Sequence, residues 1–298
     1  MSGPRDPRWR ARDAAWFATE PGPAAPGQPP GADIWHVSLD ADDSIPWSAA
    51  RLLDARERTQ AGRLRDAVAS RRYVVAHVAA RTVLGGYLGV AAYSLRWSTG
   101  PHGKPGFDGP AGRWQWSLSR SGGHALIAVC LAAPVGVDIE RIGERTPALA
   151  LAARFLPAEE AADIAARQDE AYGPRAMYHR LLSRKEACVK ASGGRLLDGL
   201  DLRVLTPGPV VGSGRFAGER WTLRDLPAPP GFVAALAAVT ASARDGTGTG
   251  TDTGTDTSTD TGSAVEPTGR LRFFEWAWRP PDQGPEYEAP VAREEEPP

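Results

Sequence analysis

Residues 135–140, with the sequence VGVDIE, place two carboxylates in a pattern that could bind a metal ion. On a strand, side chains alternate between the two faces, so Asp138 and Glu140 lie on one face and the three apolar side chains on the other. Carboxylates about 7 Å apart on one face could hold a hard divalent cation, which prefers oxygen ligands. The alternative interpretation is an ordinary half-exposed strand with an acidic outer face.

A second candidate is the stretch 182–190, with the sequence LSRKEACVK. Glu186 and Lys190 are one helical turn apart, so they project from the same face of a helix. A carboxylate beside an ammonium group could complete a metal site and hold a phosphate next to it. The alternative is a surface ion pair, which stabilises a helix by only about a few tenths of a kcal/mol.

A third candidate combines the turn 103–105 (GKP) with the stretch 116–123 (WSLSRSGG). Lys104 in a Gly/Pro turn, and Ser119 with Arg120 where a strand meets a turn, are suited to binding phosphate oxygens. The alternative is turn chemistry alone, because Gly, Pro and Ser are common in turns. The sequence has no Walker loop, and the glycines of 85–89 lack the preceding strand of a dinucleotide-binding motif.

The periodicity of apolar residues predicts the elements that must position these groups. Strands are expected at 33–39, within 114–131 around a Ser/Gly turn, at 135–139 and at 232–239. Helices are expected within the proline-free stretch 50–88, from Pro157 onward, and at 178–191. Because each half of the chain combines helices with a few strands, we expect an α+β fold rather than a long parallel sheet.

Changes in composition divide the chain into six segments. They are a disordered extension (1–32), an N-terminal half-domain (33–134), a C-terminal half-domain (135–243), a flexible Gly/Thr/Asp linker (244–269), a terminal strand (270–280) and an acidic disordered tail (281–298). The linker has only small and polar residues over most of its length, so it offers nothing to bury.

The overall composition excludes several classes of protein. The 298 residues include 33 glycines and 27 prolines, too many for a long helical bundle or coiled coil. A formal net charge of −1 gives no general reason to expect a nucleic-acid partner, although the acidic tail leaves a mildly basic body that suits an anionic ligand. The distant Cys130 and Cys188 indicate small core residues rather than a disulfide framework or a zinc site. With no signal peptide and no apolar run of about 18 residues, we expect a cytoplasmic protein without a membrane partner.

Taken together and in this order, the motifs resemble the 4′-phosphopantetheinyl transferase superfamily, in its larger, surfactin-type form. The family pattern is a GKP turn, a strand with an SHS motif, a G-x-D-x-E strand, and a helix reading W-x-x-KEA-x-x-K-x-x-G. The corresponding segments are 103–105, 116–121, 136–140 and 182–193. The resemblance covers about residues 34–243. It implies a monomer of two similar α/β half-domains, related by pseudo-twofold symmetry, with the active site between them.

The resemblance also implies an activity. Members of the family transfer the 4′-phosphopantetheine arm of coenzyme A to a serine of an apo acyl or peptidyl carrier protein, and release adenosine 3′,5′-bisphosphate. Coenzyme A is then the co-substrate, and the partners are carrier proteins of polyketide, non-ribosomal peptide or fatty-acid synthesis.

The resemblance assigns Asp138, Glu140 and Glu186 to a Mg²⁺ ion that bridges the pyrophosphate of coenzyme A. Such a role agrees with the preference of Mg²⁺ for carboxylates and phosphates. Glu186 is also the candidate general base, acting on the serine directly or through a metal-bound water. Lys190 and Lys104 would hold pyrophosphate oxygens.

At the nucleotide end, the resemblance implies that Ser119 and Arg120 contact phosphate. Arg72, with Arg71 beside it as a second candidate, would contact the 3′-phosphate. The alternative for this arginine pair is a helix with solvated arginines. Glu159 and Glu160 follow a helix-starting proline, and we interpret them as helix N-terminal acids stabilised by the helix dipole.

Three positions depart from the family pattern. Arg120 replaces the histidine of the SHS motif, Ser117 replaces an asparagine, and Leu182 replaces the tryptophan of the KEA helix. Arg120 keeps a cation that could pair with phosphate. The departures motivate an alternative hypothesis, a non-catalytic paralogue that binds coenzyme A or a carrier protein without transferring the arm. A structural protein with fortuitous motifs is the third hypothesis.

Overall fold

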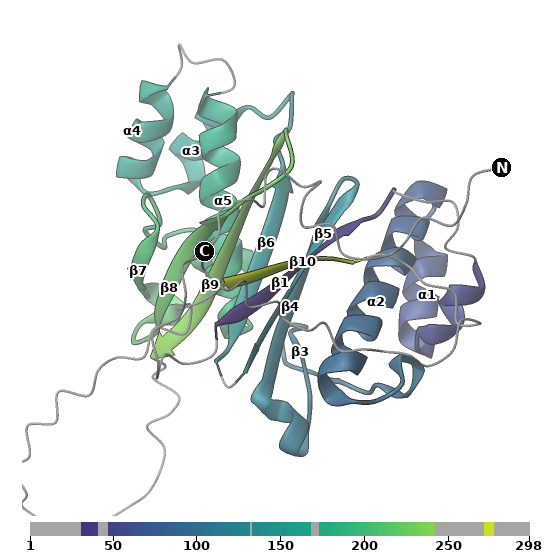
Figure 1. Ribbon diagram of the computed structural model, residues 1–298. Helices are drawn as coiled ribbons and strands as arrows, with labels where there is room; N and C mark the ends of the chain where they lie inside the picture. The colour runs from purple at the N-terminus through teal and green to yellow at the C-terminus, as the bar shows by residue number, and fades with distance from the viewer. Residues whose placement is uncertain (1–30, 41–46, 132, 168–172, 242–270, 277–298) are drawn as a thin grey trace, which may run out of the picture.

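A computed structural model describes residues 31–40, 47–131, 133–167, 173–241 and 271–276. Two four-stranded sheets lie between two groups of helices (Figure 1). The strand order is β10-β1-β5-β4 in the first sheet and β6-β9-β8-β7 in the second. The predicted α+β class is confirmed. The predicted linker at 244–269, the tail at 281–298 and nearly all of the extension at 1–32 lie outside the described residues.

The N-terminal part of the chain builds the first sheet and the helices that cover it. Its strands are β1 (Ala32–Ser38), β4 (Trp114–Ser121) and β5 (His124–Leu131), and the small hairpin consists of β2 (Ser98–Thr99) and β3 (Pro105–Gly106). Its helices are α1 (Ala55–Arg63) and α2 (Ala67–Leu88), with the 3-10 helices η1 (Trp47–Leu52), η2 (Ala92–Ser94) and η3 (Gly109–Arg113). The helical pattern of 50–88 is therefore divided, since Asp54 and Asp66 each cap the start of a new helix.

The second sheet and its helices follow in the chain. The strands are β6 (Val135–Arg141), β7 (Gly208–Val211), β8 (Arg220–Leu226) and β9 (Phe232–Ala241). The helices are α3 (Ala148–Phe155), α4 (Ala158–Ala166) and α5 (Gly173–Ser192), with the 3-10 helices η4 (Leu196–Gly199) and η5 (Gly214–Phe216). The predictions of a helix after Pro157 and of one over 178–191 are confirmed, although α5 already begins at Gly173.

Strand alternation divides the core into layers. Ile34 and Trp35 are neighbours on β1, yet Ile34 packs between the two sheets and Trp35 packs toward α2. On the far side of the second sheet, a third cluster includes the apolar face of α5. Cys130 and Cys188 are buried in two of these clusters as free thiols, which confirms the prediction of small core residues.

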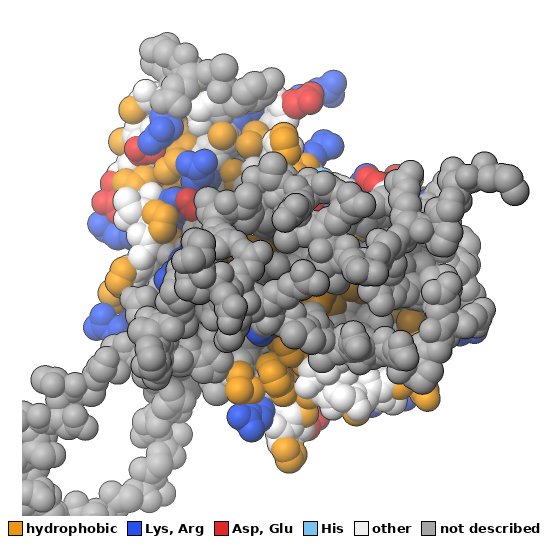
Figure 2. Space-filling view, in the orientation of Figure 1, with side chains coloured by type: hydrophobic (Ala, Val, Ile, Leu, Met, Phe, Trp, Pro, Cys, Tyr) orange, Lys and Arg blue, Asp and Glu red, His pale blue; other side chains and the backbone are white. Residues whose placement is uncertain are grey.

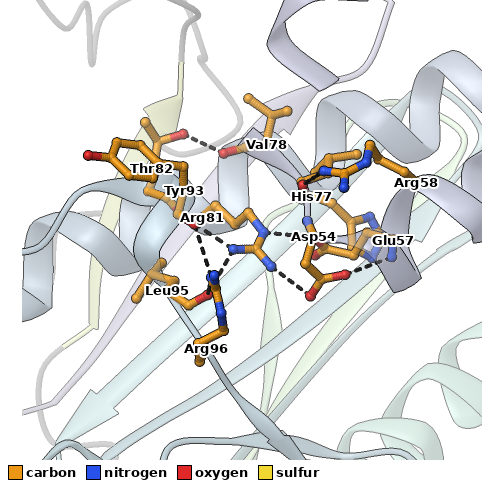
Figure 3. Close-up of polar contacts among 12 residues, drawn as sticks. Asp54, Glu57, Arg58, His77, Val78, Arg81, Thr82, Tyr93, Leu95 and Arg96 are labelled. Carbon is orange, nitrogen blue, oxygen red and sulfur yellow. Dashed lines mark hydrogen bonds and ion pairs between the residues drawn. The ribbon is translucent and has the colours of Figure 1, made fainter. Parts of the chain in front are cut away.

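A buried arginine fastens the helices of the N-terminal part to one another (Figure 3). Arg81 of α2 is fully buried, with Nε 2.7 Å from Glu57 and Nη2 2.8 Å from Asp54. Its Nη1 donates to the carbonyls of Ala92 and Leu95. Because Asp54 and Glu57 also form the capping box of α1, one guanidinium group fixes α1 and the segment after α2 against α2.

The strand β10 (Leu271–Trp276) completes the first sheet from the C-terminal end of the chain. It pairs in parallel with β1, and Leu271 lies opposite Ala32. Nε and Nη2 of Arg272 each donate to a carboxylate oxygen of Asp33 at 2.6 Å. Phe274 stacks on Trp35 with 4.6 Å between the ring centroids. The segment predicted as a terminal strand thus covers the edge of β1.

The surface and the helices bear on the partners expected from the sequence. Figure 2 shows Lys/Arg and Asp/Glu side chains interspersed with hydrophobic ones over the part that holds α3 and α4. In the described segments, none of the helices combines the length and the apolar character needed to cross a bilayer.

The contact that positions the candidate site is a close approach of α5 to β6 at Gly136. A Cβ atom at Gly136 would lie 2.0 Å from the carbonyl oxygen of Ala187 and 2.4 Å from the amide nitrogen of Ala191. Both of these atoms belong to the backbone of α5, so they cannot rotate away. Only glycine permits this distance between helix and strand.

Replacing Gly136 with alanine should therefore push α5 away from β6. We expect Gly136→Ala to lower the free energy of unfolding by about 3 kcal/mol, as for overpacked cores. Urea unfolding followed by circular dichroism measures this loss. Gly62→Ala is the matched control, because a Cβ atom at Gly62 in α1 meets no atom within 4 Å. It should stabilise the protein slightly, and equal stability of both variants would contradict the proposed close contact.

Candidate metal and phosphate site

Three of the predicted carboxylates converge at the junction of β6 and α5. Asp138 and Glu140 of β6 point to the same side as Gly136, and Glu186 projects from α5 toward them. The three residues offer oxygen atoms that all lie within 4.8 Å of one another. Among the described residues this is the single group of acidic, histidine and cysteine side chains arranged so that it could hold a metal ion.

Lys190 and Ser119 complete this acidic cluster. The Lys190 Nζ lies 2.6 Å from Asp138 Oδ1 and 3.4 Å from Glu186 Oε2. It also donates to Ser119 Oγ at 3.0 Å, and Ser119 Oγ donates to Asp138 Oδ1 at 2.7 Å. Helical spacing and strand alternation set the face of each residue, and tertiary packing brings the three elements α5, β6 and β4 together.

Burial and neighbouring charges shift the pKa of Glu140, Glu186 and Lys190 in the cluster. Burial, and then the charges of Asp138 and Glu186, raise the pKa of Glu140 to about 7. Burial and Asp138 also raise the pKa of Glu186. Although burial opposes the charged form of Lys190, the carboxylates of Asp138 and Glu186 raise the pKa of its ammonium group. A single ammonium group therefore only partly compensates three acidic side chains, and the cluster favours an additional cation.

The atoms of Asp138 test whether the cluster suits a divalent cation. Asp138 is only 1% exposed, and its Oδ2 is buried without a hydrogen-bond partner among the described residues. Buried carboxylate oxygens rarely lack a partner, so Oδ2 is available for a ligand. The donor set consists of carboxylate oxygens, which hard cations such as Mg²⁺ prefer. The residues present therefore fit such an ion.

Three alternating serines of β4 connect the two sheets beside the cluster. Ser117 Oγ accepts a hydrogen bond from the amide of Val137 at 3.1 Å, and Ser121 Oγ accepts one from the amide of Arg141 at 3.0 Å. Ser119 lies between them on the same face of β4. Two side-chain hydroxyls therefore take the place of backbone carbonyls between β4 and β6. This role of the serines was not predicted from the sequence. Its only signal there is a serine at every second position of the strand.

The predicted arginines gather beside the first turns of α2 rather than at the carboxylates. Arg120 points away from Ser119, as neighbours on a strand must, and its guanidinium group lies 5.2 Å from the ring centroid of Tyr73. Arg72 forms a bidentate pair with Asp40, at 2.8 and 2.6 Å. Arg71 precedes it in α2 with a partly buried side chain.

Lys104, which was expected to bind phosphate, contacts backbone carbonyls instead. Its Nζ donates to the carbonyls of Val135 at 3.1 Å and Lys190 at 2.8 Å, and also to that of Ala191. Burial lowers the pKa of Lys104 to about 8. Because carbonyls already occupy the three donors of the ammonium group, the structure does not support the expectation that Lys104 holds pyrophosphate oxygens.

Glu160 lies in the first turn of α4, as predicted, and it has a second role that the sequence did not reveal. Its side chain is the fully buried partner of Lys185, with 2.7 Å between Oε2 and Nζ. Glu160 Oε1 accepts from the amide of Val204 at 2.8 Å, and Lys185 donates to the carbonyl of Leu202. The pair joins α4 to α5 beside Glu186. Glu159 does lie at the surface, where Arg203 pairs with it at 3.2 Å.

Residues 134–224, which include β6, α5 and the three carboxylates, match the model of the 4′-phosphopantetheinyl transferase superfamily. This part of the chain is therefore similar to domains of that superfamily.

Two curated proteins are similar to the chain beyond this domain. The chain is 27% identical over 206 residues to "4′-phosphopantetheinyl transferase HetI" from Nostoc sp. strain PCC 7120. The aligned region covers 68% of this chain and 86% of the relative. It is also 27% identical over 173 residues to "Putative 4′-phosphopantetheinyl transferase slr0495" from Synechocystis sp. strain PCC 6803, which covers 58% and 69%, respectively. Homology to these two proteins supports the family resemblance found in the motifs.

The buried pair of Glu160 and Lys185 leads to a prediction about stability. Lys185→Met leaves an uncompensated buried carboxylate and should lower the free energy of unfolding by about 3–5 kcal/mol. The double variant Lys185→Met/Glu160→Gln keeps an acceptor for Val204 without the charge, so it should be more stable than Lys185→Met alone. Urea unfolding of the wild type, both single variants and the double variant measures the coupling. Additive losses would show that the two residues do not form a compensated pair.

Proposed function

We propose that the protein transfers the 4′-phosphopantetheine arm of coenzyme A to a serine of an apo acyl or peptidyl carrier protein, with Mg²⁺ as the metal. The products are the holo carrier protein and adenosine 3′,5′-bisphosphate. The observation that carries this proposal is the convergence of Asp138, Glu140 and Glu186 within the superfamily domain. Homology to the Nostoc protein, which is named as a 4′-phosphopantetheinyl transferase, adds support for the transfer reaction.

The acidic cluster supplies the groups that the reaction needs. Asp138, Glu140 and Glu186 would hold the Mg²⁺, and Asp138 Oδ2, which has no hydrogen-bond partner among the described residues, would be one of the ligand atoms. When bound, the ion supplies Lewis-acid stabilisation of the pyrophosphate charge that grows as the bisphosphate leaves. Lys190 lies beside these carboxylates, and its ammonium group would pair with a pyrophosphate oxygen. Glu186 would accept the proton of the attacking serine hydroxyl, directly or through water.

The residues beside α2 suit the nucleotide end of coenzyme A. Arg120 lies over Tyr73 with an exposed side chain, and Arg72 is only moderately buried in its pair with Asp40. Guanidinium groups bind phosphates through paired hydrogen bonds, so we assign Arg120, Arg72 and Arg71 to the phosphates of the nucleotide. Ser119 lies on the other side of β4, within the acidic cluster, and we assign it to orienting Asp138 and Lys190.

The proposal extends to the architecture of the whole enzyme. We propose a cytoplasmic monomer of the surfactin type, in which the segments 33–134 and 135–243 are half-domains related by pseudo-twofold symmetry. The position of Ser119 on β4, next to Asp138 on β6 and Lys190 on α5, supports an active site between these two segments. Carrier proteins of polyketide, non-ribosomal peptide or fatty-acid synthesis are the proposed partners.

Intact-mass spectrometry tests the reaction. An apo carrier protein incubated with the protein, coenzyme A and Mg²⁺ should gain the mass of one phosphopantetheine group, and EDTA should abolish the gain because it removes the ion. Added Mg²⁺ in excess of EDTA should restore the reaction. If several carrier proteins gain no mass while the protein still binds coenzyme A, the non-catalytic paralogue is the correct hypothesis.

A single substitution tests the role of the acidic cluster. Asp138→Asn removes one negative charge but keeps the size of the side chain, and we expect it to slow carrier loading by roughly a hundredfold through weaker metal binding. The matched control is Asp163→Asn on α4, where the carboxylate makes a surface pair with Arg167. The control should load the carrier at the wild-type rate. Normal loading by Asp138→Asn at limiting Mg²⁺ would exclude the proposed metal site.

A further inference from the structure

We infer that Lys104 is a positioning residue, which clamps the C-terminal end of α5 to the start of β6 and so sets the distance between the carboxylates of the acidic cluster. The effect of Lys104 on the transfer of phosphopantetheine rests on the proposed function. The clamp itself is a property of the protein without ligands. The residue belongs to a GKP turn that the sequence assigned to phosphate binding.

The contacts of the ammonium group define the clamp. Lys104 Nζ donates to the carbonyl oxygens of Lys190 and Ala191, in the last turn of α5, and to that of Val135, the first residue of β6. Carbonyls in the last turn of a helix have no partner within the helix, and a cation there also interacts favourably with the helix dipole. One side chain therefore satisfies carbonyls on two elements at the same time.

The Lys104 side chain comes from the hairpin of β2 and β3, which is separate from α5 and β6. The amide of Gly100 donates to the carbonyl of Lys104 at 2.8 Å, and Gly103 adopts a φ of +92°, which a side chain would strain. The aliphatic stem of Lys104 lies against Gly193, where a Cβ atom would be 3.4 Å from Lys104 Cδ. Gly193, with a φ of +69°, ends α5 in a left-handed conformation.

The clamp acts on the same two elements that carry the acidic cluster. Asp138 and Glu140 follow Val135 on β6, and Glu186 lies one turn before Lys190 on α5. Gly136 brings the backbones of the two elements into contact, and Lys104 bridges them just beyond that contact. A shift of the end of α5 would change the distance from Lys190 and Glu186 to Asp138. Lys104 thus fixes the cluster without touching a carboxylate.

Hydrogen exchange of the protein without ligands tests the clamp itself. Lys104→Met keeps the stem against Gly193 but removes all three donors, so amides near the end of α5, at 189–194, should exchange about tenfold faster, as expected for lost buried hydrogen bonds. Lys104→Arg retains a cation at the helix end and should restore part of the protection. Unchanged exchange at 189–194 in Lys104→Met would overturn the clamp, whether or not the protein is a transferase.

Metal binding and kinetics then distinguish a clamp from a phosphate ligand. We expect Lys104→Met to weaken binding of Mn²⁺, used as a paramagnetic probe without coenzyme A, by about tenfold, as is typical for groups that support metal ligands. In carrier loading it should raise the half-saturating Mg²⁺ concentration, and Lys104→Arg should reverse part of this effect. The control Arg272→Met removes an ion pair on the far edge of the first sheet and should leave Mn²⁺ affinity unchanged.

Two results would contradict this role. Wild-type Mn²⁺ affinity in Lys104→Met, combined with a higher KM for coenzyme A alone, would make Lys104 a ligand of the substrate. An equal loss of Mn²⁺ affinity in Arg272→Met would show only general destabilisation. Failure of the wild type to load any carrier would instead refute the proposed function, while the exchange and Mn²⁺ results would still decide the clamp.

Discussion

The candidate site depends on the contact between two backbones at Gly136. The absence of a side chain at this position lets α5 approach β6 until a Cβ atom would lie 2.0 Å from the carbonyl oxygen of Ala187. At this separation, Glu186 and Lys190 reach the carboxylate of Asp138 across the junction. The buried pair of Glu160 and Lys185 supports the other side of α5. A helix even slightly farther away would separate Glu186 and Lys190 from the two carboxylates of β6.

This closeness makes the acidic cluster electrostatically unfavourable in the free protein. Burial and the neighbouring carboxylates raise the pKa of both Glu140 and Glu186, and Asp138 Oδ2 is buried with no hydrogen-bond partner in the part of the chain that the structure describes. Lys190 compensates part of the charge, and Ser119 fixes the position of Asp138 Oδ1. The cluster therefore destabilises the free protein, and a divalent cation would offset this effect. Such locally unfavourable arrangements are characteristic of functional sites.

The serines of β4 at the junction between the two sheets both link the sheets and contact the acidic cluster. Ser117 and Ser121 link β4 to β6 through side-chain hydroxyls, and Ser119 between them contacts the acidic cluster. Because side chains rather than a backbone ladder make these links, the hydroxyl between them is free to orient Asp138. The N-terminal sheet is held by contacts of its own, among them the pair of Arg272 with Asp33. The cluster thus lies where elements from both parts of the chain meet.

The sequence by itself determined which side chains share a face. Alternation placed Asp138 with Glu140, helical spacing placed Glu186 with Lys190, and the same rules predicted β6, α5 and the α+β class. The tertiary structure decided the partners of the remaining charges. Lys104 binds backbone carbonyls, and Glu160 is buried against Lys185, because the approach of distant elements selects these partners and no local spacing records it. Arg120 and Ser119 are neighbours in sequence but belong to different surroundings, since the strand turns them to opposite sides and only the packing of α2 and β6 fills those sides.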